Sequence, residues 1–439
     1  MRVLWLCNIM LPVIAKQMGL PGSNKEGWLS GLAAKAAREK PTDMTLGVCF
    51  PVAGEPVQGE TDGMVWYGFS EDTAHPERYD PELEGRLGRI LSDFQPDVLH
   101  CFGTEYPHTL AMVRAFGRPR RTLIGIQGLC FVYADAYMAD LPEKIQRRTL
   151  LRDFLKRDNL LCQQDKYRQR GVFEQEALRQ TGHVTGRTGW DRKWTAHVNP
   201  DAVYHFMNET LRPSFYGPKW DIGSCMPWSI FVSQGNYPIK GLHYLLQAMP
   251  TVLKRYPSAH LYVAGDEITR ISTWKEKLKL SNYGKYLREL IAVNHLEGAV
   301  TFLGRLDEDQ MLQRFLCSHV FISPSSIENS PNSVGEAMLL GMPVISSDVG
   351  GVADMLRRDV EGYLYPPGDV AMLAERICTV FDPHNQEMIQ DMGGAARKHA
   401  LQTHDPETNY RRLLEIYHEI YLCIELYQPS SDTRVVRPL

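Results

Sequence analysis

The sequence lacks the cysteine patterns that indicate a disulfide framework or a zinc site. Its nine cysteines are odd in number and scattered along 439 residues, and none of them forms a Cys-x-x-Cys pair. Most lie within apolar runs, where a reduced and buried thiol is the ordinary state. This usage argues against a disulfide-stapled secreted domain and indicates a reducing, cytosolic compartment.

The sequence also lacks a charge excess and a long apolar run. Lys and Arg total 48 against 52 Asp and Glu, for a net charge of −4, which argues against a dedicated nucleic-acid binder. No run of 18 or more apolar residues is present, so no membrane-spanning helix is expected. The apolar start, residues 1–15, is interrupted by Asn8 and Pro12, and we interpret it as a buried strand followed by a loop.

What the sequence does contain is an alternation of short apolar runs and helical patterns. A length of 439 residues favours two domains. Strand–helix alternation predicts a parallel sheet with helices on both faces. In the first half the predicted strands are residues 3–7, 43–50, 63–69, 97–103 and 122–128.

The second half repeats this alternation, and we predict a second doubly wound α/β domain. The boundary falls near residues 215–227, where Gly and Pro interrupt any periodicity, so we assign residues 1–215 to the first domain and 216–400 to the second. Two such domains predict a ligand in the cleft between them, at the carboxyl ends of the strands. The predicted strands are residues 228–235, 259–265, 299–304, 319–325 and 343–347.

The segment ENSPNSVGE, from Glu328 to Glu336, follows one of these buried strands. Ser330 is a good N-cap and Pro331 suits the first helical position, so a helix is expected to begin here. It is expected to stop at Gly341.

This predicted helix start offers a site for an anion. The free backbone N–H groups of Asn332, Ser333 and Val334 would face the carboxyl end of the strand, a geometry that binds phosphates. Glu336 would lie one turn further along and could accept hydrogen bonds from ribose hydroxyls, and Glu328 could reach a group beyond the phosphates. On spacing alone, a capped surface helix with two solvated glutamates explains the segment at least as well.

The wider context resembles a known family. Residues 328–336 are followed by AMLLGMPVISSDVGG (337–351) and by EGYLYPPGD (361–369). In this order, the motifs are similar to those of the donor domain of retaining GT-B glycosyltransferases of family 4, over residues 231–381. The resemblance implies two Rossmann-like domains with a cleft, Glu328 on the donor sugar and Glu336 on the ribose. As in relatives, the last helical pattern, residues 409–426, would pack back on the first domain.

The family's phosphate-binding motif, G-R-x(n)-K-G, resembles residues 231–249. Lys240 matches its lysine and would neutralise the departing diphosphate. The usual arginine is absent, and Gly235 lies in its neighbourhood as a donor-binding candidate. For Lys240 the alternative, which we favour less, is a solvated lysine before a helix. Arg305 is our candidate for the second cation, and a solvated surface arginine explains it equally well.

In the first domain the family resemblance is weaker. Gly22 lies where the family carries a glycine-rich loop. Gln127 occupies the place of the family histidine, where an amide can hydrogen-bond the donor sugar but cannot carry a proton. His108 is the nearest candidate for proton transfer, although a lone loop histidine is more often structural.

Residues 144–171 are rich in Lys and Arg with apolar residues interleaved. A basic amphipathic helix of this kind could lie on an anionic membrane, and a solvated helix face explains it equally well. Downstream, residues 183–194 and 199–216 resemble a bacterial branch associated with cell-surface polysaccharides. In that context Arg187, Trp190 and Asp191 could line the interdomain cleft.

Together these features predict a retaining transferase that moves a hexose from a UDP- or GDP-sugar to a saccharide or lipid-linked acceptor. It would lie in the cytoplasm, with peripheral contact to the membrane's inner face. We identify no Asp-x-Asp metal motif and expect neither metal nor cofactor. Two alternatives stay open: a catalytically inactive sugar-nucleotide-binding protein, and another GT-B enzyme such as an epimerase or a phosphorylase.

Overall fold

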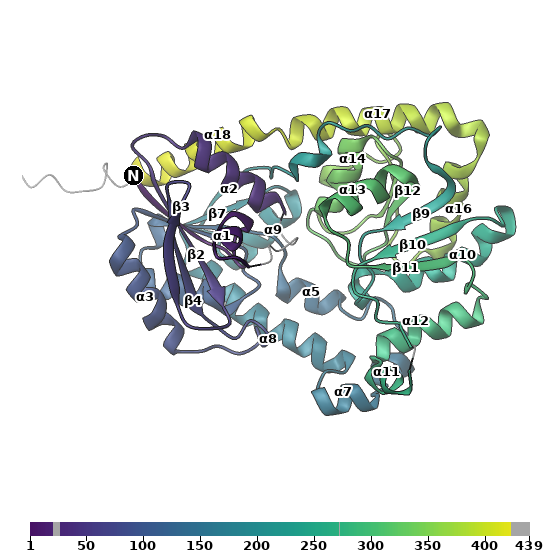
Figure 1. Cartoon of the computed structure of the whole chain (residues 1–439), viewed down its shortest axis with the longest axis horizontal. Coiled ribbons are helices and arrows are strands. Elements are labelled where there is room, and N and C mark those ends of the chain that lie inside the picture. The colour runs from purple at the N-terminus through teal and green to yellow at the C-terminus, as the bar shows by residue number, and fades with distance from the viewer. Residues whose placement is uncertain (21–26, 272, 423–439) are drawn as a thin grey trace, which may run out of the picture.

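The computed structural model describes residues 1–20, 27–271 and 273–422. It contains two sheets, each covered by helices on both faces (Figure 1). The fold class predicted from the alternation of strands and helices, two doubly wound α/β domains, is therefore confirmed.

The first sheet has the strand order β3-β4-β2-β1-β5-β6-β7-β8. All neighbouring strands are parallel except β3 and β4. The strands are β1 (Arg2–Leu6), β2 (Thr45–Val52), β3 (Val57–Thr61), β4 (Met64–Ser70), β5 (Val98–Phe102), β6 (Thr122–Gly125), β7 (His183–Gly186) and β8 (Val203–Phe206).

The antiparallel pair β3–β4 corrects the expectation of a purely parallel sheet. Asp62 and Gly63 connect the two strands, and both have positive φ angles of 49° and 66°. An Asp-Gly pair with both residues at positive φ is the turn that two-residue hairpins favour. This dipeptide was the available sequence signal for the hairpin.

Helices surround this sheet, and two hydrophobic cores fill the space on its faces. One core includes residues of α2 and α18, and the other includes residues of α3, α4 and α8. The helices of this half are α1 (Pro12–Gln17), α2 (Gly27–Glu39), α3 (Glu82–Phe94), α4 (Pro107–Phe116), α5 (Cys130–Ala136), α6 (Glu143–Arg147), α7 (Leu151–Lys156), α8 (Leu160–Arg179) and α9 (Gly189–Val198).

The second sheet is parallel throughout, with the order β11-β10-β9-β12-β13-β14. One of its cores lies under α10, α12 and α16, and the other under α13, α14 and α17. The strands are β9 (Met226–Val232), β10 (His260–Ala264), β11 (Val300–Gly304), β12 (Ser318–Ser323), β13 (Val344–Ser347) and β14 (Tyr363–Tyr365). The helices are α10 (Leu242–Arg255), α11 (Trp274–Lys279), α12 (Asn282–Val293), α13 (Glu308–Cys317), α14 (Asn332–Leu340), α15 (Val352–Met355), α16 (Val370–Phe381), α17 (Gln386–Thr403) and α18 (Pro406–Leu422).

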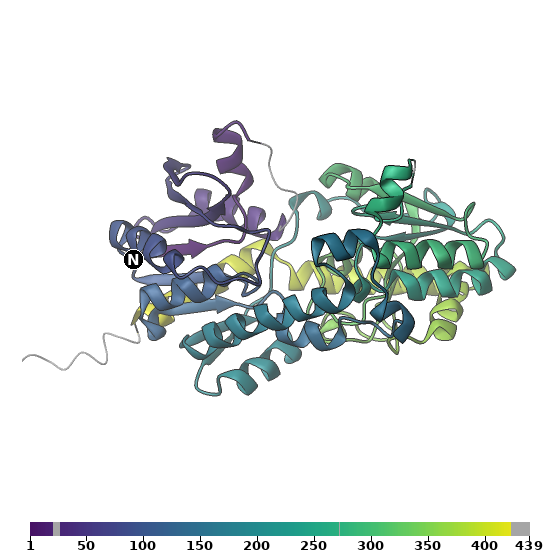
Figure 2. The same ribbon diagram turned by 90° about the horizontal axis from the view of Figure 1, so that it is seen from below.

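The last two helices run from the second domain back to the first, as Figures 1 and 2 both show. Helix α17 packs on α14, and α18 lies against α2 and β5. On α18, the Tyr417 hydroxyl accepts a hydrogen bond from Trp5 Nε1 at 2.8 Å and lies 2.7 Å from His100 Nδ1. Helices α17 and α18 therefore form a second connection between the two domains.

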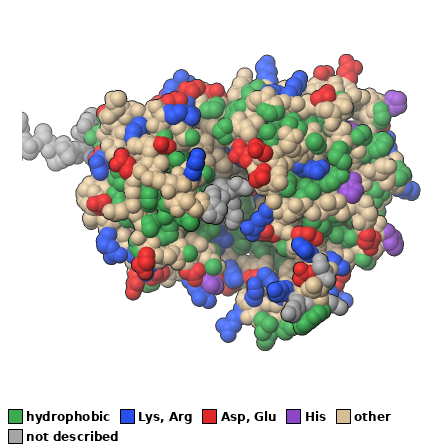
Figure 3. All heavy atoms as spheres, in the orientation of Figure 1, with side chains coloured by type: hydrophobic (Ala, Val, Ile, Leu, Met, Phe, Trp, Pro, Cys, Tyr) green, Lys and Arg blue, Asp and Glu red, His purple; other side chains and the backbone are tan. Residues whose placement is uncertain are grey.

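Residues 144–171 do not form the single amphipathic helix that their pattern predicts. They form α6, α7 and the first part of α8. Ile145 and Leu160 belong to the same hydrophobic core as the strands of the second sheet, so this part of the first half packs against the second domain. Figure 3 shows hydrophobic and basic side chains side by side at the lower tip of the molecule, where Figure 1 places α7 and α11. In the part of the chain that the structure describes, no helix has the length and apolarity needed to cross a membrane.

Candidate functional site

The segment from Glu328 to Glu336 forms the connection between β12 and α14. Strand β12 is buried along its whole length, and α14 begins at Asn332 with Pro331 as its N-cap residue. The expected N-cap at Ser330 is wrong by one residue, because the Ser330 hydroxyl instead accepts a hydrogen bond from Arg187 Nε. The helix ends, as predicted, at Gly341, which has a left-handed conformation with φ of 73°.

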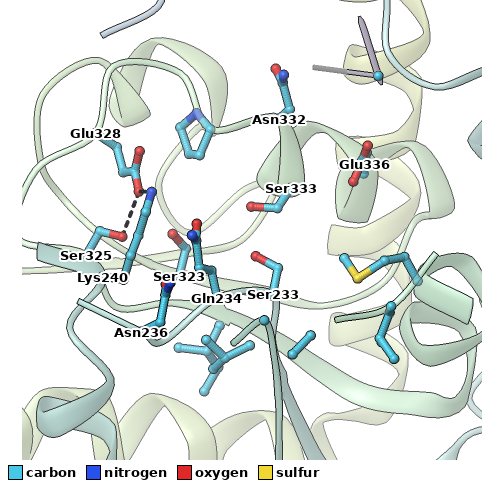
Figure 4. Close-up of a pocket in the computed structure, with 18 of the residues that line it drawn as sticks. Ser233, Gln234, Asn236, Lys240, Ser323, Ser325, Glu328, Asn332, Ser333 and Glu336 are labelled. Carbon is cyan, nitrogen blue, oxygen red and sulfur yellow. Dashed lines mark hydrogen bonds and ion pairs between the residues drawn. The ribbon is translucent and has the colours of Figure 1, made fainter. Parts of the chain in front are cut away.

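A cavity of about 680 Å³ lies at the carboxyl ends of β9, β10 and β12, in front of the start of α14. In Figure 4 the labelled side chains come from β12, from the connections that follow β9 and β12, and from α14, with Glu328 and Glu336 on opposite sides. The cavity is therefore at the position where open parallel sheets bind ligands. The predicted site residues that line it are Lys240, Arg305, Glu328, Asn332, Ser333 and Glu336.

At one side of the cavity, Glu328 and Lys240 form a buried ion pair. Lys240 Nζ lies 2.5 Å from Glu328 Oε1, and the Ser325 hydroxyl donates to the same oxygen at 2.8 Å. Burial alone would lower the pKa of Lys240, but Glu328 outweighs it, and the pKa is raised above its ordinary value. Lys240 therefore stays cationic at neutral pH.

The position of Glu328 is fixed by the glycine turn that follows β13. Gly351 donates a backbone hydrogen bond to the Glu328 carbonyl at 3.2 Å. A side chain at Gly350, which has φ of 57°, would collide with that same carbonyl. The two glycines are thus required for the close approach that holds Glu328 beside the cavity.

At the other side of the cavity, Glu336 is held by Arg212. The guanidinium donates from Nε to Oε1 at 2.6 Å and from Nη2 to Oε2 at 2.5 Å. Burial raises the pKa of Glu336, whereas the charge of Arg212 acts to lower it, and the pKa stays above its ordinary value. Arg212 also lies over the ring of Phe215, at 4.5 Å from its centroid. Sequence reasoning missed Arg212, which comes from the connection between the two domains.

Between these two pairs lies the N-terminal end of α14. Asn332 and Ser333 line the cavity, and the first N–H groups of a helix have no partner within it. Val334 differs from the prediction because its N–H donates to the Pro331 carbonyl at 2.9 Å and its side chain is fully buried. The amides that remain candidates for an anion are therefore those of Asn332 and Ser333.

The other donor-site candidates occupy three different settings. Arg305 lies at the cavity rim, with its side chain 78% exposed and paired with Asp266. Gly235 does not line the cavity; a side chain there would lie 2.6 Å from Leu242 Cδ2, so Gly235 allows α10 to pack closely. Gly22 lies outside the described residues.

The catalytic candidate Gln127 takes part in a network between the domains and does not line the cavity. Its Nε2 donates to Glu209 Oε1 at 2.5 Å, and its Oε1 accepts from Arg187 Nη2 at 3.4 Å. Burial raises the pKa of Glu209, against the opposing charge of Arg187, with which it is ion-paired. Because Arg187 also contacts Ser330, this network connects the first domain to the loop that carries Glu328.

Trp190 and Asp191 lie where the two domains meet. Asp191 is fully buried at the seam between the domains, where it accepts a hydrogen bond from Asn329 Nδ2 at 3.2 Å. Trp190 packs against one hydrophobic core of each domain, so it also lies at the seam. Neither residue lines the cavity.

His108 lies in a sealed environment. It is fully buried, with Nδ1 at 2.6 Å from Glu71 Oε2 and Nε2 at 2.9 Å from Asn8 Oδ1. Its ring also stacks on Tyr106. These contacts correct the expectation that His108 exchanges a proton with a substrate, since both nitrogens hold the first domain together.

Two further points correct or extend the prediction. The triplet Asp307-Glu308-Asp309 has the Asp-x-Asp spacing that we expected to be absent, but Asp307 caps α13 by accepting from Gln310 N at 2.8 Å.

Asn236 lines the cavity with a buried Oδ1 that has no hydrogen-bond partner among the described residues. A buried acceptor of this kind is free to bind a ligand donor.

Most of the residues that line this cavity lie within a segment that matches a family model. Residues 227–382 match the family model described as Glycosyl transferases group 1. The sulfoquinovosyl transferase SQD2 of Arabidopsis thaliana is 30% identical over 161 residues, which are 36% of this chain and 28% of that protein. The phosphatidyl-myo-inositol mannosyltransferase of Mycobacterium leprae is 25% identical over 194 residues, 44% of this chain and 46% of that protein. The chain thus spans less than half the length of these curated relatives.

Solved structures extend the likeness to both domains. Sucrose-phosphate synthase from Thermosynechococcus elongatus superposes with a TM-score of 0.66 at 14% identity, covering 96% of this chain and 99% of that one. Anabaena HepE in complex with UDP-glucose superposes with a TM-score of 0.65 at 16% identity, covering 95% and 100%. The chain therefore has the GT-B fold of these structures, and residues 227–382 match the model of the group 1 glycosyl transferases.

Proposed function

We propose that the protein is a retaining glycosyltransferase that moves a hexose from a nucleoside diphosphate sugar to a hydroxyl acceptor. The observation that carries this proposal is a single cavity with the start of α14 between two carboxylates, Glu328 and Glu336. The helix start suits a diphosphate, and each carboxylate suits a group with hydroxyl donors at one end of it.

The donor is proposed to lie across the cavity with its ribose at Glu336 and its sugar at Glu328. The two Glu336 oxygens each accept one bond from Arg212 and retain lone pairs for ribose hydroxyls. Lys240 has three N–H donors, so it can hold Glu328 and still donate to a diphosphate oxygen. The occurrence of UDP-glucose in the HepE structure supports a UDP-sugar as the first donor to test.

In the proposed transfer, the acceptor oxygen bonds to the anomeric carbon on the face from which the diphosphate leaves. The bond between that carbon and the diphosphate oxygen breaks, and its electron pair stays on the diphosphate. The acceptor proton passes to a diphosphate oxygen, so no histidine is needed as a base. Lys240 and the amides of Asn332 and Ser333 stabilise the negative charge that develops, and we propose that no divalent metal is required.

For the acceptor we propose a lipid-linked saccharide at the cytoplasmic face of a membrane, in the synthesis of a cell-surface polysaccharide. Two relatives support this choice by their names, the phosphatidyl-myo-inositol mannosyltransferase and an amylovoran biosynthesis glycosyltransferase of Erwinia amylovora, which is 31% identical over 94 residues.

A thermal-shift screen against UDP-, GDP- and ADP-sugars tests the donor assignment. A ligand present at about 100 times its Kd stabilises the folded protein by roughly 2.7 kcal/mol, which raises the Tm by several degrees. For the sugar nucleotide that binds, release of nucleoside diphosphate in the presence of EDTA tests whether a divalent metal is required. The anomeric configuration of the product tests whether the transfer is retaining. If no sugar nucleotide raises the Tm at millimolar concentration, the donor assignment is wrong.

An inactive sugar-nucleotide-binding protein is the second candidate. It is favoured by Gln127, because this side chain does not line the cavity and is already bonded to Glu209 and Arg187. Donor hydrolysis separates the two candidates. Slow release of nucleoside diphosphate without acceptor supports the transferase. Tight binding of the sugar nucleotide, with no release of nucleoside diphosphate in the presence of any acceptor, supports the binding protein.

A further inference from the structure

Helix α7 is oriented with its apolar side chains outward and a charged side chain inward. Phe154 and Leu155 are 72% and 71% exposed, and Leu151 is also exposed, whereas Asp153 is only 1% exposed. This is the reverse of the arrangement that water favours for a surface helix. An apolar surface of this kind indicates a binding site for a partner or a membrane.

Polar contacts with α12 fix α7 in this orientation. Asp153 Oδ2 accepts hydrogen bonds from the backbone N–H of Leu150 at 3.3 Å and of Asn282 at 3.0 Å. Arg148, just before α7, donates from Nη1 to both Glu289 oxygens, at 2.7 and 2.8 Å. Phe154 and Leu155 are thus held outward by specific contacts on the opposite side of the helix.

A second short helix continues the same apolar surface. Helix α11 lies beside α7 and carries Trp274, which is 68% exposed, and Leu278, which is 45% exposed. Figures 1 and 3 place this surface at the lower tip of the molecule. We call the set Leu151, Phe154, Leu155, Trp274 and Leu278 the apolar tip.

Basic side chains outnumber acidic ones around the apolar tip, although Arg147 is paired with Glu143 and Arg270 with Glu276. Asp153 is buried, and Asp158 accepts hydrogen bonds from Arg152 and from Lys166. The exposed basic residues of the surrounding segments are Lys144, Arg147, Lys156, Arg157, Arg270 and Lys279.

We propose that the apolar tip inserts into the surface of an anionic lipid bilayer. Aromatic and aliphatic side chains at the end of two short helices, with Lys and Arg around them, match the interfacial region, where rings lie among headgroups and cations contact lipid phosphates. The apolar tip differs from the membrane contact predicted over residues 144–171. Residues 160–171 belong to α8, which packs on α5, and are not part of the tip, whereas α11 is. This inference goes beyond the proposed transfer and does not depend on it.

Co-sedimentation of the full chain with vesicles tests the inference. The protein is expected to bind vesicles of phosphatidylcholine with one-third phosphatidylglycerol and to bind poorly to phosphatidylcholine alone. Phe154→Ser/Leu155→Ser is expected to lower the affinity for anionic vesicles at least about tenfold, because two large apolar groups are lost from the bilayer. Lys156→Gln is expected to lower the affinity for anionic vesicles about fivefold, and the binding of this variant should depend less on salt concentration.

Val293→Ser is the matched control, because Val293 is 74% exposed on α12 and is not part of the apolar tip. All variants change exposed side chains, so their Tm values should equal that of the wild type. Release of nucleoside diphosphate with a soluble acceptor, without vesicles, is also expected to stay unchanged, which separates this inference from the proposed transfer. Equal binding by wild type and the Phe154→Ser/Leu155→Ser variant, or no preference for anionic vesicles, overturns the inference.

Discussion

The two ends of the cavity hold the same kind of contact, a buried carboxylate against a cation, but they recruit the cation differently. Glu328 pairs with Lys240 from the same domain, and both residues lie within the matched family region, 227–382. Glu336 pairs with Arg212, which lies outside that region, in the connection between the domains. The first pair is a property of the second domain alone, whereas the second pair depends on how the two domains are joined.

This difference suggests a division of labour between the two ends. Lys240 lies beside the carboxylate expected to contact the sugar, so its charge is available where the leaving group departs. Arg212 already donates to both oxygens of Glu336, so it holds that carboxylate in place for the ribose. We therefore expect the Lys240 end to control turnover and the Arg212 end to control donor binding and stability.

The largest effect is expected from Lys240→Ala. Removing a fixed cation that stabilises a departing diphosphate should lower kcat by about 10²–10³-fold, with a smaller change in KM for the donor. Steady-state release of nucleoside diphosphate measures both constants. A change in KM alone would assign Lys240 to binding and remove the proposed difference between the two ends.

An intermediate effect is expected at the other end, where a double-mutant cycle is informative. Arg212→Met leaves Glu336 buried without its cation and should destabilise the protein by about 3 kcal/mol. Glu336→Gln in the same chain should restore most of this loss, because no buried charge is then left unpaired. Denaturant unfolding measures the stability of the four proteins.

Donor binding should follow a different pattern across the same four proteins. The single and the double variant that carry Glu336→Gln are both expected to bind the donor about tenfold more weakly, since the carboxylate that accepts ribose hydroxyls is gone. Calorimetry with the nucleoside diphosphate measures this. Full donor affinity in Glu336→Gln would assign Glu336 a purely structural role as the partner of Arg212.

The smallest effect is expected from Arg305→Ala. The Arg305 side chain is 78% exposed and its pair with Asp266 is on the surface, where solvent screens charge. Donor affinity should fall by no more than about threefold, measured by the same calorimetry. A loss of turnover as large as that of Lys240→Ala would instead establish Arg305 as the second cation that the family arginine usually provides.

The sequence was most informative where a signal lies in contiguous residues. The alternation of strands and helices predicts both sheets, and the strand–turn–helix pattern predicts α14 to within a residue of its start. It fails for short elements with weak patterns, such as the four-residue strands β7 and β8. It fails also for residues 144–171, where contacts with α12 break one predicted helix into three.

The sequence by itself determined that a helix starts between Glu328 and Glu336, because backbone hydrogen bonding and capping act over a few positions. That the two glutamates bracket one site was implied by the family resemblance. Only the tertiary structure decided their partners. Glu336 meets Arg212 across 124 positions, and Gln127 meets Glu209 across 82. It also turned Phe154 toward solvent, because Asp153 is bonded to α12. Such contacts depend on how the domains pack, and this packing cannot be predicted from a pattern of neighbouring residues.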